Sequence, residues 1–140
     1  MKFSWRSDKE EAAEGTGRGS YASEAVVKSR AVPGVTFTIA KMSFGRRVEL
    51  MRRVRELARR TEFLAASEEG GAKMDAGLLR AEIERVYVTW GVTAVSGLTV
   101  DGQIAGPELL VEVGPEELFR EALAAVRRET GLSEEERKNS

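Results

Sequence analysis

The stretch VTFTIAKMSFGRRVELMRRVRELARR, residues 35–60, changes its hydrophobic period in the middle and so predicts two adjacent elements. In its first six residues Val35, Phe37 and Ile39 alternate with threonine or alanine, and this period of two predicts a half-buried strand. After Ser43, a predicted N-cap, apolar residues recur every three or four positions, which predicts a long amphipathic helix. The predicted inner face of that helix consists of Leu50, Val54, Leu57, Ala58, Thr61, Leu64 and Ala65.

The same helix carries seven arginines between Ser43 and Arg60. A nucleic-acid-binding helix gathers its basic residues on one face, whereas a solvated helix that packs on a core spreads them around. The arginines opposite the apolar face are Arg52, Arg55 and Arg59, and those that flank it are Arg46, Arg53 and Arg60. This spread favours a solvated helix.

Two glutamates are spaced to pair with arginines of the same helix. Glu49–Arg53 and Glu56–Arg60 have the favourable i,i+4 order, and each pair contributes about 0.3 kcal/mol. One alternative is that the helix contacts an acidic protein partner. A second alternative is a nucleic-acid-binding accessory protein, which would use Arg46, Arg47, Arg52, Arg55 and Arg59.

Downstream of residue 71 the sequence predicts a second helix, a hairpin and two further helices. The second helix ends with Gly91 as a predicted cap, and its apolar face consists of Leu79, Ile83, Val86, Tyr87 and Trp90. The pair Asp101-Gly102 favours a type I′ turn and predicts a hairpin over residues 98–104. A lone hairpin is marginal in water, so residues 35–40 are expected to complete a sheet with it. Residues 107–113 favour a short helix, with a strand as the alternative, and a last helix is expected between Pro115 and Gly131.

These elements predict one α+β domain that is rich in helix. We expect three main helices with a short antiparallel β-hairpin or a three-stranded sheet. Residues 1–30 have scattered charge and a GTGRGS segment, and they predict a flexible or loosely docked N-terminal arm. Residues 31–132 form the predicted globular domain, and residues 133–140 a charged C-terminal tail.

The composition limits the chemistry that this chain can perform. It has no histidine and no cysteine, which excludes disulfides, a cysteine nucleophile and Ser–His–Asp catalysis. Its 22 basic and 23 acidic residues give a net charge of −1, without the basic excess typical of nucleic-acid-binding domains. It contains no apolar segment of membrane-spanning length and no recognisable signal peptide, so a soluble cytoplasmic protein is expected. We therefore expect a non-enzymatic protein without a metal or a cofactor.

Two sequence features that resemble ligand sites have simpler interpretations. The segment GTGRG, residues 15–19, matches neither phosphate-binding glycine motif and predicts a flexible linker. Adjacent glutamates diverge around a helix, so they do not converge on a cation. These carboxylates are predicted to be solvent-facing charges: Glu116, Glu117, Glu134, Glu135 and Glu136.

The most individual feature of the sequence is Trp90 at the end of the second helix. It is predicted to be a core anchor that holds this helix against the hairpin. The alternative is an apolar groove that accepts a partner segment and is bordered by Tyr87, Trp90, Leu98 and Ile104.

The order Tyr87-Val-Thr-Trp90-Gly91, Gly97-Leu-Thr-Val-Asp-Gly102 and Pro107-Glu-Leu-Leu110 resembles small tail assembly chaperones of tailed bacteriophages and prophages. The resemblance spans residues 35–137, and the arm has no counterpart in it. It implies a non-enzymatic cytoplasmic factor that binds the long tape measure protein and helps tail tube protein assemble around it. Such a factor is absent from the finished particle. Self-association is an open alternative.

The resemblance also implies a second, longer product made by ribosomal frameshifting near the stop codon. The chain ends Arg137-Lys-Asn-Ser140, which is compatible with a slippery heptamer such as A AAA AAC. An ordinary charged tail would match equally well. Codons other than AAA followed by AAC or AAT at Lys138 and Asn139 would contradict the frameshift.

Overall fold

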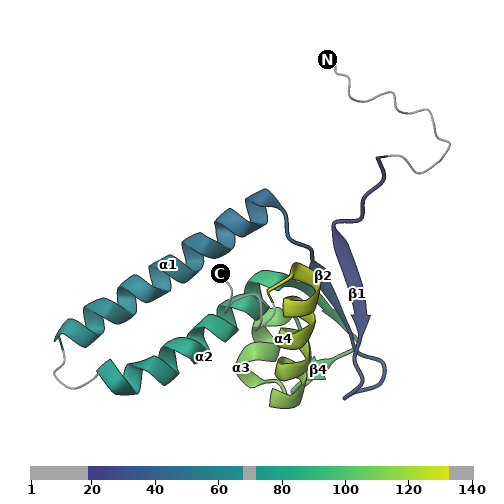
Figure 1. Ribbon diagram of the computed structural model, residues 1–140. Coiled ribbons are helices and arrows are strands. Elements are labelled where there is room, and N and C mark those ends of the chain that lie inside the picture. The colour runs from purple at the N-terminus through teal and green to yellow at the C-terminus, as the bar shows by residue number, and fades with distance from the viewer. Residues whose placement is uncertain (1–18, 68–71, 133–140) are drawn as a thin grey trace.

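The computed structural model describes residues 19–67 and 72–132, which form a three-stranded sheet with helices on one side and a separate two-stranded hairpin (Figure 1). Its strands are β1 (Glu24–Lys28), β2 (Thr36–Ala40), β3 (Val92–Ser96), β4 (Thr99–Val100) and β5 (Gln103–Ile104). Its helices are α1 (Phe44–Ser67), α2 (Ala72–Gly91), α3 (Pro107–Val113) and α4 (Glu116–Thr130). The predicted fold class, α+β with three main helices, is confirmed. The frameshift site, residues 15–18 of the glycine segment 15–19 and the tail 133–140 lie outside the described residues.

The main sheet is antiparallel, in the order β1-β2-β3. The alternation predicted for its central strand is confirmed, because Val35, Phe37 and Ile39 are at most 1% exposed. Two expectations about this sheet are wrong. The hairpin 98–104 does not pair with β2 but forms a separate two-stranded sheet. The second concerns the predicted N-terminal arm. Its residues Glu24–Lys28 form the strand β1, which pairs with Thr36–Ala40 along its whole length.

Strand β3 was not predicted. It begins directly after the last residue of α2, and only Val92 of its five residues is fully buried. A bulge between Thr38 and Ile39 also breaks its register with β2. The strand therefore lacks the strict alternation from which a half-buried strand is recognised.

The core lies between the sheet, the C-terminal part of α2 and α4. From α2 it contains Tyr87, Val88 and Trp90, and from α4 it contains Leu118, Ala122, Leu123, Ala125 and Val126. Gly91 allows α2 and α4 to approach closely, since a Cβ atom there would lie 2.7 Å from Cγ1 of Val126. The helix ends at Gly91, the predicted cap position, and the φ of Gly91 is not positive.

The hairpin and the short helix follow the predicted turn chemistry. Asp101 and Gly102 have φ of 51° and 81°, as a type I′ turn requires. Residues 107–113 form a helix with Pro107 in its first turn, so the alternative strand is wrong. Gly131, with φ of 78°, ends α4 in the left-handed conformation.

A carboxylate joins the β1–β2 turn to α4. Glu121 accepts hydrogen bonds from the Ser29 hydroxyl and the Arg30 backbone N–H, both at 2.6 Å. Partial burial raises the pKa of Glu121, but these bonds and one from the Ala31 backbone hold the pKa below its ordinary value. The charged form of Glu121 therefore stabilises this turn.

Helix α1 begins at the predicted N-cap, where the Ser43 hydroxyl accepts a hydrogen bond from the Arg46 backbone N–H at 3.2 Å. It packs mainly against α2, and the two helices form a hairpin that extends away from the sheet (Figure 1). No helix within residues 19–67 and 72–132 combines the length and apolar character needed to cross a membrane.

Candidate functional site

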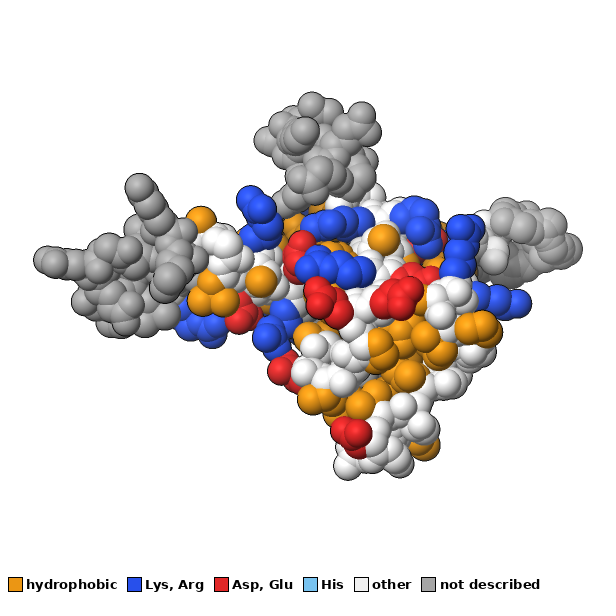
Figure 2. Space-filling model, turned by 90° about the horizontal axis from the view of Figure 1, so that it is seen from below, with side chains coloured by type: hydrophobic (Ala, Val, Ile, Leu, Met, Phe, Trp, Pro, Cys, Tyr) orange, Lys and Arg blue, Asp and Glu red, His pale blue; other side chains and the backbone are white. Residues whose placement is uncertain are grey.

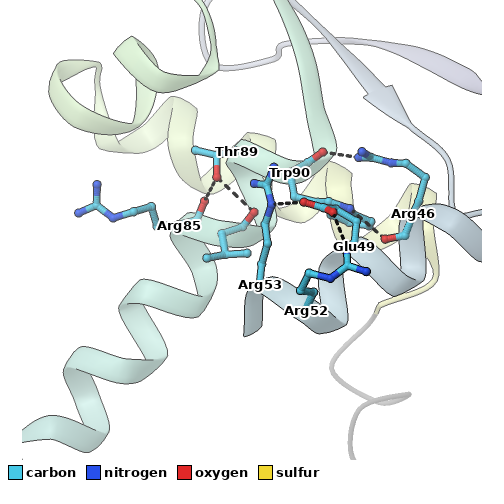
Figure 3. A network of polar contacts seen from close by, with 8 residues as sticks. Arg46, Glu49, Arg52, Arg53, Arg85, Thr89 and Trp90 are labelled. Atoms are coloured by element: carbon cyan, nitrogen blue, oxygen red, sulfur yellow. Dashed lines mark hydrogen bonds and ion pairs between the residues drawn. The ribbon is translucent and has the colours of Figure 1, made fainter. Parts of the chain in front are cut away.

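The base of the α1–α2 hairpin is held by Arg46 and Trp90 (Figure 3). The indole N–H of Trp90 donates a hydrogen bond to the Arg46 carbonyl at 3.2 Å, and the Arg46 guanidinium donates one to the Trp90 carbonyl. The guanidinium also lies 4.6 Å from the centre of the indole ring, within cation–π range. Burial lowers the pKa of Arg46 below its ordinary value. This reciprocal pair fixes the first turn of α1 to the end of α2.

The four residues of the predicted partner groove differ widely in burial. Trp90 and Tyr87 are 2% and 7% exposed, so they offer little surface to a partner. Leu98 is half-buried, and Ile104, on the hairpin, is 86% exposed. Trp90 is therefore a core residue, as in the simpler of the two interpretations, but its hydrogen bonds join α2 to α1 and not to the hairpin.

A different groove, of about 690 Å³, lies along α1. We call it the α1 groove. Its apolar lining consists of Val48, Leu50, Met51, Val54, Ala58, Tyr87 and Leu132, and its basic lining of Arg47, Arg52 and Arg55. Met51 is 60% exposed, although α1 as a whole is an amphipathic helix packed on α2. The α1 groove thus contains two of the predicted site arginines, Arg52 and Arg55, together with the predicted site residue Tyr87.

Sequence reasoning missed the α1 groove because it made the apolar face of α1 too narrow. Leu50 and Leu57 are each 6% exposed and lie on the buried side of this face, and Leu50 also borders the groove. Val48 and Met51 were left out of the predicted face, yet they extend the apolar surface to the side that α2 leaves open. Their spacing of three along a helix was the available signal.

The ion pairs on α1 differ in part from those predicted. Arg53 pairs with Glu49 at 2.9 Å as expected, and Arg52 contacts the same carboxylate at 3.2 Å. The hydrogen bond from Arg53 lowers the pKa of Glu49 below its ordinary value. Glu56 pairs with Arg59 and not with Arg60, so that predicted pair is wrong.

Two arginines of the α1 groove have no such partner. In the part of the chain that the structure describes, the guanidinium groups of Arg47 and Arg55 form neither ion pairs nor hydrogen bonds. Both side chains are exposed. The α1 groove therefore carries uncompensated positive charge.

The surface formed by α2, α3 and α4 carries both positive and negative side chains. On the face seen in Figure 2, Lys and Arg side chains lie beside Asp and Glu side chains and do not form one continuous positive area. Arg120 contacts Glu84 at 3.0 Å and Glu116 at 3.4 Å, and Arg85 pairs with Glu112. These pairs leave little basic surface there for a phosphate backbone.

Within residues 19–67 and 72–132, no three His, Cys, Asp or Glu side chains come together as a metal site would require. Glu116 and Glu117 are both exposed in the first turn of α4. Glu134, Glu135 and Glu136 lie outside the described residues.

No family model matches the chain, and comparisons with curated proteins and with solved structures found no significant match.

Proposed function

We propose that this chain is a non-enzymatic assembly chaperone of a tailed bacteriophage or prophage. It would bind the tape measure protein in the cytoplasm of the bacterial host and assist tail tube protein to assemble around it. The observation that carries the proposal is the sequence pattern Trp90-Gly91, Asp101-Gly102 and Pro107-Glu-Leu-Leu110. Its parts correspond to the end of α2, the β4–β5 turn and the first turn of α3.

The α1 groove supports a binding function independently of that pattern. A chaperone needs accessible apolar surface that can cover apolar segments of an unassembled partner. The half of α1 nearest the sheet offers such surface, with Met51 exposed and with Val48, Val54 and Ala58 half-buried. The Arg46–Trp90 pair holds this part of α1 in place, so its apolar side chains are arranged before a partner arrives.

Co-expression with the tape measure protein of the same genome tests the proposal. We expect the tape measure protein to be soluble and to co-purify with a tagged copy of this chain. The control is co-expression with an unrelated small acidic protein at the same level. If the tape measure protein is equally soluble in both cases, the proposed function is wrong.

A further inference from the structure

We infer that the α1 groove binds an amphipathic helix of another protein whose apolar face is flanked by Asp or Glu. The inference rests on the proposed function for the identity of that protein, which would be the tape measure protein. The chemistry of the bound segment follows from the α1 groove itself. Four features determine it: length, backbone chemistry, charge and the poor fit of the C-terminal residues and of a second copy.

The length of the α1 groove fits a helix of about three turns. Its residues on α1 run from Arg47 to Ala58, and at 1.5 Å per residue they span about 17 Å. Tyr87 from α2 and Leu132 after α4 close its other side. A helix placed here would lie against α1 with apolar residues at spacings of three and four facing Met51 and Val54.

The backbone chemistry of the α1 groove favours a helix over an extended segment. An extended segment leaves its backbone N–H and C=O groups unpaired unless a strand edge receives them. All of the lining on α1 comes from within a helix, whose backbone groups already bond to one another. A bound helix satisfies its own backbone and needs only side-chain contacts.

The positive charge of the α1 groove favours a bound helix with acidic residues beside its apolar face. Arg47 and Arg55 have no partner among the described residues, and Arg52 shares the single carboxylate of Glu49 with Arg53. Carboxylates beside the apolar face of a bound helix would lie near these guanidinium groups, whereas lysines there would be repelled. Three arginines around an apolar floor thus give both attraction and selectivity.

The C-terminal residues of this chain do not supply a suitable occupant. The residues after Leu132, SEEERKNS, include three glutamates but no apolar side chain that could cover the apolar floor. A second copy that docked symmetrically on the same surface would bring two sets of arginines close together. A segment of a different protein is the occupant that fits the charge of the α1 groove.

Three labelled peptides and the full chain test the inference by fluorescence anisotropy at low and moderate salt. Each peptide has about 18 residues, because shorter helices are marginal in water. The first has Leu at helical spacing with Glu on both flanks, the second has Lys in place of Glu, and the third has the first composition without the spacing. We expect the first peptide to bind at least about tenfold more tightly than the others, and less tightly as salt increases.

Two matched pairs of variants locate the binding. Met51→Asp should weaken binding of the acidic peptide by at least about tenfold, whereas Leu78→Asp on α2 should leave it unchanged. The two side chains are comparably exposed, at 60% and 59%. Arg55→Glu should weaken binding by about three- to tenfold, and Arg60→Glu, outside the α1 groove, by less than about twofold. Circular dichroism would confirm that each variant is folded.

Equal binding of the acidic and basic peptides, or full binding by Met51→Asp, would overturn the inference. Self-association of the free chain in solution that Met51→Asp abolishes would also overturn it, because a second copy would then occupy the α1 groove. Co-expression separates the two proposals. If the Met51→Asp variant keeps the tape measure protein as soluble as the unaltered chain does, the inference about the α1 groove is wrong and the chaperone function stands. Selective peptide binding without solubilisation contradicts only the chaperone function.

Discussion

Replacing Gly97 with alanine tests how the two turns at one end of the sheet fit together. Gly97 follows β3 with φ of 85°, in the left-handed region that L side chains rarely adopt. A Cβ atom there would overlap the carbonyl oxygen of Gly34 and lie 3.0 Å from its carbonyl carbon. Gly34 belongs to the connection between β1 and β2, so the clash is with backbone and cannot be relieved by rotating a side chain.

The magnitude follows from two separate costs. The left-handed conformation costs a non-glycine residue about 1 kcal/mol. Forcing the backbone of the neighbouring turn to move adds about 2 kcal/mol, as for other overpacked sites. Gly102→Ala is the matched control, because Gly102 has φ of 81° but nothing within 4 Å of its Cβ position. We therefore expect a loss of about 3 kcal/mol for Gly97→Ala and about 1 kcal/mol for Gly102→Ala.

Urea unfolding followed by far-ultraviolet circular dichroism measures both free energies of unfolding. The difference of about 2 kcal/mol between the variants isolates the contact between the turns. Equal losses for the two variants would refute the close packing of Gly97 on Gly34 and, with it, the placement of the β1–β2 connection beside the end of β3.

Three further outcomes follow from the structure. The lowered pKa of Glu121 means that its stabilisation is complete above its unfolded pKa of about 4 and is lost as pH falls through the lower folded value. Glu121→Gln should thus cost about 1 kcal/mol at pH 7 and progressively less as the pH falls below about 4, as measured by urea midpoints, and a pH-independent difference would contradict the role given to Ser29. Gly77→Ala, in α2 with open space around its Cβ position, should raise the free energy of unfolding by about 0.5–1 kcal/mol, and a loss would show that this turn of α2 is not regular helix. Because several arginines are paired with glutamates, the chain should not bind duplex DNA or RNA measurably at low ionic strength, and a steeply salt-dependent affinity would favour the alternative function.

Elements with a strong local signal could be predicted from the sequence. The alternation around Phe37, the capping serine at position 43 and the Asp101-Gly102 turn each depend on neighbouring residues only, and each is confirmed. The pairing of β2 with β1 and β3 depends on contacts between distant segments. Nothing local in Glu24–Lys28 distinguishes an edge strand from an extended arm, so β1 was missed.

The candidate site was harder to predict for the same reason. An apolar residue in a helix predicts burial, and Trp90 was therefore a reasonable anchor but a poor partner contact. The α1 groove exists because α2 leaves part of the broad apolar face of α1 uncovered. Whether the surface around Met51 and Val48 stays open depends on the angle at which α1 packs on α2. The periodicity of either helix does not determine that angle.

Hydrogen exchange of this chain with and without the proposed partner, the tape measure protein, most directly tests the proposal that α1 forms the binding surface. The α1 groove spans Arg47 to Ala58, and its amides can open locally because α1 packs mainly on one neighbour. We predict that the partner slows exchange in this segment and around Tyr87 and leaves the β4–β5 hairpin unchanged. Slowed exchange confined to the hairpin or to β1, with α1 unaffected, would contradict the account.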